Sequence, residues 1–323
     1  MPLRKCLFLK MLLVALCVSL IGCADEHKPE ERPVSRVGPA PSFALAWGSL
    51  GSGDNQFNQP IGVTADKDGF VYVADSLNDC IKKYKGDGTF VAKWESGSLD
   101  DEDSAKPADV AIDGRNGVVY VVELEHHIVE KFSKYGGFMD VWGGAGAGDR
   151  QFYFPTGIAV DAAGNVYVAD TKNSRIKKMR DDGTPLAKWN GPIESPLLRP
   201  EGVAVDASGN VYVADTHNSR VVKFDSQGEV VGVWGQRGEG NGQFYFPCAV
   251  AIDPDGYVYV ADTYNHRIQK LRTDGTFVAR WGTPGNYEDE FNEPRGVAVD
   301  SNGNVYVAEA GNHRVQKFTY PGR

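Results

Sequence analysis

The sequence contains little cysteine and no long apolar segment. Five of its 323 residues are cysteine, and three of them lie near the N-terminus: Cys6, Cys17 and Cys23. Cys80 and Cys248 alone remain for the rest of the chain, and a disulfide framework needs more than two. The apolar run Met11–Ile21 is shorter than the roughly 20 residues that span a bilayer. The composition therefore excludes a disulfide-stapled scaffold and a bundle of transmembrane helices.

Basic residues are also outnumbered. The chain has 34 Lys and Arg against 43 Asp and Glu, a net charge of −9. Positions 1–22 contain basic residues but no acid, so the remainder is more acidic still. Such a surface repels phosphate backbones, and we expect no nucleic-acid partner. The chain also lacks nucleophilic-elbow, phosphate-cradling and haem-attachment motifs, which favours a binding or scaffolding protein over an enzyme.

The N-terminus resembles a bacterial lipoprotein signal. Basic residues precede the apolar run, which ends in Leu20-Ile21-Gly22-Cys23, similar to a lipobox. The resemblance implies cleavage before Cys23 and lipid on that residue, which would hold the chain on a membrane of the bacterial cell envelope. We therefore predict a signal peptide over 1–22 and, from its proline and charge, a flexible tether over 23–42. An ordinary secretory signal is the alternative.

From residue 43 onward one pattern recurs six times. The copy at 209–224 reads Gly-Asn-Val-Tyr-Val-Ala-Asp-Thr-His-Asn-Ser-Arg-Val-Val-Lys-Phe. Each copy follows a proline, at intervals of 45–48 residues: Pro60, Pro107, Pro155, Pro200, Pro247 and Pro294. Every complete unit holds four short runs rich in valine and aromatics, without helical spacing. In the first two runs both the odd and the even positions are apolar, so both faces of the sheet must be covered by protein. We therefore predict an all-β, six-bladed β-propeller over 43–323, with four-stranded antiparallel blades.

The tryptophans predict how the ring closes. Repeats one to five end their fourth strand in tryptophan: Trp94, Trp142, Trp189, Trp234 and Trp281. The sixth repeat runs out before any such strand, and the missing residue is Trp47, within 43–48. We predict that this N-terminal strand completes the last blade, because the closed ring then has no open edge. In that ring Cys80 and Cys248 lie two blades apart, so we expect free thiols.

A turn motif of Asp-Thr-x-Asn-x-Arg followed by an aliphatic residue resembles the NHL repeat. It is clearest at 170–176, 215–221 and 262–268, and Gly-Gln-Phe at 242–244 before a blade proline also fits. The resemblance covers 43–320 and implies an NHL-type propeller. Propellers of this family include protein- and RNA-binding modules and the copper- or zinc-dependent peptidyl-hydroxyglycine lyases. Membership therefore leaves the activity open.

Two enzyme alternatives accompany the binding hypothesis. A lyase resembling the peptidyl-hydroxyglycine lyases would need three histidines converging on one metal near the axis. His217, His266 and His313 lie on consecutive blades, but at turn positions, and the last two share one repeat position, which indicates repeat composition. A calcium-dependent, lactonase-like propeller has no matching motif. We predict no cofactor, with a divalent cation (calcium or zinc) as the alternative.

Charges that recur in most blades are predicted to be scaffold. A chemical site needs each group once, whereas turn aspartates accept amide hydrogens and arginines pair with carboxylates in every blade. The predicted structural set consists of Asp75, Asp170, Asp215, Asp262, Arg175, Arg220, Arg267 and Arg314.

Charges that occur once are better candidates for a ligand site. Asp109, Glu201 and Arg295 follow blade prolines, where the innermost strand begins, so the topology places them at the mouth of the central channel. Solvated rim charges are the alternative. Tyr153 and Tyr245 precede blades three and five on the same face. They would suit a protein, peptide or glycan partner, with packing against neighbouring loops as the alternative.

Blade two departs most from the repeat. It has Glu123 where most blades have aspartate, and its next turn contains Glu125, His126 and His127. Glu123 and His126 are candidate ligands for a divalent metal, but we favour a degenerate blade with a solvated acidic loop. Glu125 and His126 complete the candidate ligand-binding set. The sequence as a whole predicts a monomeric, lipid-anchored propeller that binds a partner through its channel-mouth face.

Overall fold

A computed structural model describes residues 40–97 and 104–320 of the chain. Cys23, the signal peptide and nearly all of the predicted tether lie outside the described residues. Within the described ranges no helix is long and apolar enough to cross a membrane.

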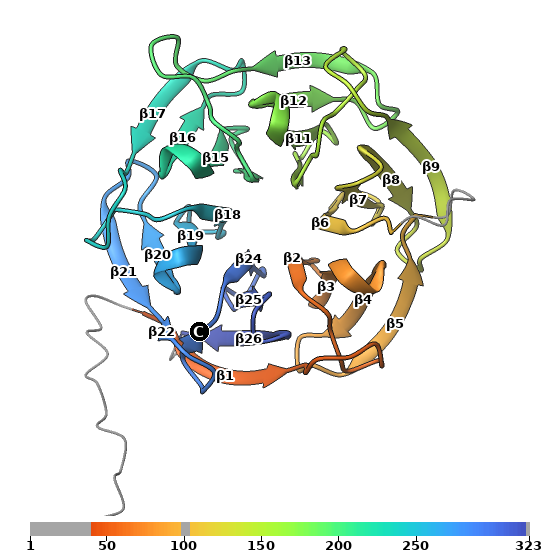
Figure 1. The fold of residues 1–323 in the computed structure, drawn as a ribbon, viewed down its shortest axis with the longest axis vertical. Coiled ribbons are helices and arrows are strands. Elements are labelled where there is room, and N and C mark those ends of the chain that lie inside the picture. Colours follow the sequence, from red (N-terminus) through yellow and green to blue (C-terminus); the bar gives the residue numbers. More distant parts are fainter. Residues whose placement is uncertain (1–39, 98–103, 321–323) are drawn as a thin grey trace, which may run out of the picture. The chain divides into compact units, whose positions relative to one another are not determined.

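Six four-stranded antiparallel sheets surround a central axis (Figure 1). Blade one consists of β2 (Pro60–Ala65), β3 (Phe70–Asp75), β4 (Cys80–Lys85) and β5 (Phe90–Glu95). Blade two consists of β6 (Pro107–Ile112), β7 (Val119–Glu123), β8 (Ile128–Phe132) and β9 (Phe138–Gly143). Blade three consists of β10 (Gly157–Val160), β11 (Val166–Asp170), β12 (Arg175–Met179) and β13 (Pro185–Trp189).

The second half of the ring repeats this order. Blade four consists of β14 (Gly202–Val205), β15 (Val211–Asp215), β16 (Arg220–Phe224) and β17 (Val230–Trp234). Blade five consists of β18 (Pro247–Ile252), β19 (Val258–Asp262), β20 (Arg267–Leu271) and β21 (Phe277–Trp281). Blade six consists of β24 (Pro294–Val299), β25 (Val305–Glu309), β26 (Arg314–Thr319) and β1 (Ser42–Trp47).

Short elements join the second and third strands or support the crossovers. Single turns of 3-10 helix are η1 (Ser76–Asn78), η2 (Thr171–Asn173), η3 (Thr216–Asn218) and η4 (Thr263–Asn265). A parallel pair of two-residue strands, β22 (Thr283–Pro284) and β23 (Glu290–Phe291), supports the crossover into blade six. The fold is thus the predicted all-β, six-bladed propeller, and the sequence period corresponds to one blade.

The N-terminal strand closes the ring, as predicted. β1 pairs antiparallel with β26, and Trp47 lies opposite Val315. The Trp47 indole also reaches the next blade, with its ring centroid 5.7 Å from that of Tyr84. Because β1 and β26 come from opposite ends of the described chain, blade six cannot be completed without the N-terminal segment.

Five of the six outer tryptophans pack on a turn glycine of the following blade. A Cβ on Gly228 would lie 2.0 Å from Nε1 of Trp189, so no side chain fits there. Gly228 also has a φ of +90°, in the left-handed region that glycine adopts without strain. Equivalent contacts link the pairs Trp47 and Gly88, Trp94 and Gly136, Trp142 and Gly183, and Trp234 and Gly275.

The second strand of each blade lies between two neighbouring blades. All five residues of β11, β15 and β19 are buried. This burial is expected because both faces of these strands carry apolar side chains. In five of the six blades the tyrosine of this second strand donates its hydroxyl to the aspartate that closes the first strand, for example Tyr212 to Asp206 at 3.1 Å. The exception is Tyr120 in blade two. The crossover phenylalanines are fully buried beneath the blades: Phe57, Phe152, Phe244 and Phe291. Cys80 and Cys248 are buried free thiols, as expected.

Candidate functional site at the mouth of the central channel

The charges that recur around the ring form buried, saturated contacts within each blade. In blade four the Asp215 carboxylate accepts the Leu198 N–H at 2.7 Å, the Asn218 amide at 2.9 Å and Arg220 Nε at 2.7 Å. Blades three and five repeat this pattern around Asp170 with Arg175 and Asp262 with Arg267. In blade one Lys82 replaces the arginine beside Asp75, at 2.8 Å, and in blade six Arg314 pairs with Glu309 at 2.5 Å. These groups tie the crossover to the blade and leave little capacity for a ligand.

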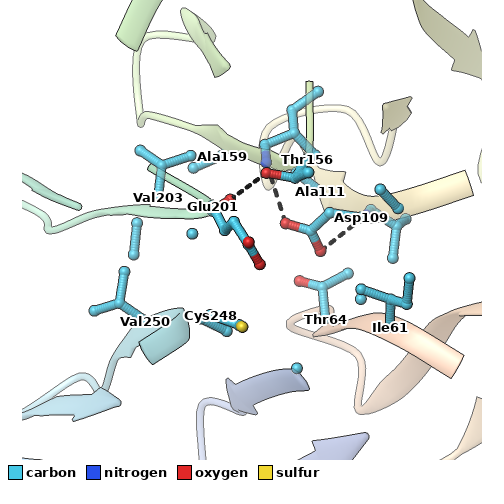
Figure 2. A pocket seen from close by; sticks show the side chains of 18 of the residues that line it. Ile61, Thr64, Asp109, Ala111, Thr156, Ala159, Glu201, Val203, Cys248 and Val250 are labelled. Atoms are coloured by element: carbon cyan, nitrogen blue, oxygen red, sulfur yellow. Dashed lines mark hydrogen bonds between the residues drawn. The ribbon is translucent and has the colours of Figure 1, made fainter. Parts of the chain in front are cut away.

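The six inner strands enclose a cavity of about 550 Å³ on the axis. Its walls are aliphatic, with Ile61, Val203 and Val250 among the lining residues (Figure 2). Asp109, Glu201 and Arg295 all line this one cavity. The structure therefore brings together the three single charges that were predicted to lie at the channel mouth.

Asp109 lies within the channel wall rather than on a solvated rim. Its Oδ1 accepts the Val110 N–H at 2.9 Å, and its Oδ2 accepts the Ile158 N–H of blade three at 3.1 Å. The side chain is partly accessible to the cavity, yet protein encloses it on its other sides. Burial raises the pKa of Asp109 to about 7, against the opposing effect of the two N–H donors. No ion pair within the described ranges involves this carboxyl group, so it titrates near neutral pH without a basic partner.

Glu201 and Arg295 meet across the inner strand of blade five. Arg295 Nη1 lies 3.5 Å from Glu201 Oε2, with side chains 28% and 22% exposed. Arg295 Nη1 also lies 3.9 Å from the Cys248 sulfur. Burial raises the pKa of the Cys248 thiol well above its usual range, so this cysteine stays protonated and is a poor nucleophile.

Two of the residues just before the blade prolines lie at the mouth of the cavity, and sequence analysis missed them. Phe154 and Arg199 line the mouth, together with Lys172 and His217 from the second turns. Lys172 Nζ sits 3.2 Å from the Phe154 ring centroid. The signal was present in the sequence, because the position preceding the proline varies around the ring, with only phenylalanine occurring twice: Gln59, Lys106, Phe154, Arg199, Phe246 and Glu293.

These six residues share a left-handed backbone that a contact between blades stabilises. Their φ values lie between 47° and 52°, which is costly for residues other than glycine. In five of them the N–H is accepted by a side chain of the preceding blade. The acceptors are Asp79, His127, Ser174, His266 and His313. Three histidines thus accept backbone hydrogens in separate blades, which agrees with the interpretation of His266 and His313 as part of the repeat.

The remaining candidates of blade two lie outside the cavity: Glu123, Glu125 and His126. Glu125 pairs with Lys106 at 3.0 Å. His126 Nδ1 lies 2.8 Å from Glu123 Oε2, and the buried Glu123 shares Ser96 with Glu130. Among the described residues no group of three histidine, cysteine, aspartate or glutamate side chains has a geometry that fits a metal ion. Glu123 and His126 therefore belong to a cluster of polar side chains that also contains Ser96 and Glu130.

The two predicted aromatic residues belong to clusters beside the mouth. Tyr153 is 43% exposed, and its ring centroid lies 5.4 Å from that of His127. Tyr245 packs 5.6 Å from Tyr264 and lies 4.6 Å beneath the Arg237 guanidinium. Neither tyrosine lines the cavity, so they widen the apolar surface around the opening without entering it.

These features define a β-propeller with a ligand-sized cavity on its axis. The NHL repeat family model matches residues 57–84, 152–179, 197–224, 244–271 and 291–318. The chain belongs to the NHL-repeat propellers, and the unmatched second blade is the one whose turn lost the Asp-Asn-Arg pattern. No curated protein matches the chain by sequence.

Several solved structures share the fold at low sequence identity. A streptogramin B lyase superposes with a TM-score of 0.63 at 18% identity, covering 86% of this chain and 98% of its own. Virginiamycin B lyase from Staphylococcus aureus gives 0.59 at 15% identity, covering 85% and 98%. An auxiliary nutrient binding protein from Bacteroides thetaiotaomicron gives 0.64 at 14% identity, covering 87% and 76%. These similarities concern the fold alone.

Proposed function

We propose that this propeller is a binding module that takes a small ligand, or the end of a peptide chain, into the mouth of its central channel. We further propose that lipid on Cys23 holds it on a membrane of the bacterial cell envelope. One observation carries the binding proposal: the charges that occur once line a single cavity of about 550 Å³. Aliphatic walls with a few convergent polar groups are typical of ligand sites.

The recurring charges support the same conclusion by contrast. Asp170, Asp215 and Asp262 are fully buried and satisfied within their blades. In contrast, no basic side chain in the described part of the chain pairs with Asp109, and the pair of Glu201 with Arg295 is long. The fold neighbours include proteins described as a nutrient binding protein and as antibiotic lyases, so propellers of this shape serve both binding and catalysis.

A lyase is the second candidate, and one observation favours it. An acid whose pKa is about 7, as burial gives Asp109, can accept or donate a proton efficiently at neutral pH. In this case Asp109 would act as a general base on a substrate held in the channel. The metal-dependent version has less support, because of the three histidines His217, His266 and His313 only His217 lines the cavity, whereas His266 and His313 each accept a backbone N–H at a blade junction.

Blocking the channel without changing its charges tests the binding proposal. Thr64 points into the cavity from β2 (Figure 2), so Thr64→Phe should fill it, while Thr64→Ser keeps the hydroxyl and the space. We would titrate a short apolar peptide with free ends, the same peptide with blocked ends, and a neutral oligosaccharide by calorimetry. A probe that binds the wild type should lose at least about tenfold in affinity, or about 1.4 kcal/mol, in Thr64→Phe.

The serine variant should bind that probe within a few fold of the wild type. Equal binding by wild type and Thr64→Phe would place the ligand off the axis and contradict the proposal. A chromogenic or mass-spectrometric assay for turnover of the bound probe would then separate binding from lyase activity.

A further inference from the structure

The charge of Asp109 is not required to close the ring. At the equivalent position blades one, three, four and six have glycine and blade five has Ala249. The glycines permit close approach of the inner strands, since a Cβ on Gly157 would lie 2.2 Å from the Glu201 carbonyl oxygen. Five junctions therefore form without a carboxylate. At the sixth, an ionisable group faces an enclosed cavity, where burying an unpaired charge is costly.

A second carboxylate points into the same space. Figure 2 shows the Glu201 side chain extending toward the channel centre, opposite Asp109 and Thr64. The cavity also has three basic side chains, but two of them lie at the outer rim. Lys172 stacks on Phe154, and Arg199 precedes its blade proline and is exposed. The third is Arg295, already 3.5 Å from Glu201.

The charges are therefore layered along the channel. Cations lie at the rim, the Glu201–Arg295 pair comes next, and Asp109 follows one residue further along its inner strand. Beyond them the walls are aliphatic, with Ile112, Val205 and Val299 among the lining residues. Beyond the rim cations and the Glu201–Arg295 pair, the ionised Asp109 has no paired cation among the described residues, so at this depth it attracts a cation and repels a carboxylate.

We propose, resting on the binding function proposed above, that the channel's ligand presents a primary ammonium group to Asp109 and Glu201 and lays an aliphatic segment against the valine walls. An ammonium group donates three hydrogen bonds, and Asp109, Glu201 and the Thr64 hydroxyl, which line the same cavity, offer acceptors for them. An alkylamine or the amino end of an apolar peptide has this chemistry.

Binding of such a ligand depends on pH through Asp109. Since burial raises its pKa to about 7, Asp109 is mostly protonated at pH 6 and mostly ionised at pH 8, while an alkylamine stays charged throughout. Affinity for the amine should therefore rise by up to about tenfold from pH 6 to pH 8. The other titratable and charged groups that line the cavity are Glu201, Cys248, His217, Lys172, Arg199 and Arg295.

Three probes of equal chain length test the proposal: hexylamine, hexan-1-ol and hexanoate. Titrated into the folded propeller at pH 8, hexylamine should bind at least about tenfold more tightly than the other two. Asp109→Asn should remove most of that preference and the pH dependence. Glu201→Gln serves as the second variant, because Asp109→Asn also alters a hydrogen bond to Ile158. Glu125→Gln changes a carboxylate outside the cavity and should bind as the wild type does.

The outcomes separate this inference from the proposed function. If hexanol or hexanoate binds as tightly as hexylamine, or if no probe binds, the ammonium proposal is wrong. If one of them binds and Thr64→Phe blocks it, the channel remains the binding site. If hexylamine binds Thr64→Phe as tightly as the wild type, both proposals fail. His217→Gln should keep the pH dependence, and its loss there would assign the effect to His217 instead.

Discussion

Replacing Glu130 by glutamine should stabilise the propeller at neutral pH. Glu130 is fully buried on β8, and its Oε2 accepts the Ser96 hydroxyl at 3.0 Å and the Gly97 N–H at 3.1 Å. Its Oε1 has no hydrogen-bond partner. Glu123 lies beside it, sharing Ser96 and bonding His126. Two buried carboxyl groups thus meet where four of the other blades place a lysine or a glutamine and blade four places Val222.

The other blades show why glutamine fits. Gln269 in blade five and Gln316 in blade six occupy the equivalent position. Each donates its amide to the buried carboxylate of its blade, at 3.0 Å from Asp262 and 2.8 Å from Glu309. In blade two the same donation requires a proton on Glu130. Glu130→Gln supplies the donor permanently and still offers an oxygen to Gly97.

The size of the effect depends on pH in a defined direction. Burial, reinforced by Glu123, raises the pKa of Glu130 to about 8, from about 4.3 in an unfolded chain. Between these values the unfolded chain releases a proton that the folded protein keeps, so stability falls as pH rises. The slope approaches about 1.4 kcal/mol per pH unit, and by pH 7 the cumulative loss is on the order of 3–4 kcal/mol, roughly 1 kcal/mol of it already at pH 5.

Urea denaturation at pH 5 and pH 7.5 measures this difference. We expect Glu130→Gln to be more stable than the wild type by roughly 1 kcal/mol at pH 5 and by about 3–4 kcal/mol at pH 7.5. The matched control is Glu125→Gln, a partly exposed carboxylate in the same blade, which should change the free energy of unfolding by no more than about 1 kcal/mol. If the free energies of unfolding of Glu130→Gln and the wild type differ by the same amount at both pH values, the inference that folded Glu130 keeps its proton is wrong.

Four further predictions concern closure, scaffold, blade contacts and anchor. Trp47→Ala should lower the free energy of unfolding by about 3 kcal/mol, because it removes the packing of β1 on the next blade; an unchanged urea midpoint would contradict this role in closure. Arg220→Ala should cost about 3–5 kcal/mol, since it leaves Asp215 buried without its cation, and a loss below about 1 kcal/mol would show that Asp215 is satisfied by its other donors. Burial lowers the pKa of His127, so the wild type should lose stability as pH falls below about 6.5, and His127→Asn should lose less in melting curves from pH 7.5 to 5. Cys23→Ser should abolish lipid labelling and release the protein from the membrane fraction, and continued membrane association would count against the proposed anchor.

Much of the candidate site followed from comparing repeat positions. Reading the residues after each blade proline singled out Asp109, Glu201 and Arg295, because a position that differs between blades is free of the constraint that the scaffold imposes. The same comparison before the proline would have added Phe154 and Arg199. Glu130 escaped notice because the third strand tolerates lysine, valine and glutamine at its position, so a glutamate there is no clear departure.

The sequence by itself determined the number of blades, the four-stranded unit and the closure by β1. These depend on local hydrophobic periodicity and on one tryptophan per blade, both of which are visible along the chain. Only the tertiary structure decided that Asp109 bonds to Ile158 of the next blade, that Glu201 reaches Arg295 across blade five, and that Glu123 lies beside Glu130. Those contacts join residues whose separation is set by the curvature of the closed ring and by strand register. The protonation of Asp109 and Glu130 depends in turn on how completely the neighbouring blades enclose them, which no pattern along a single strand records.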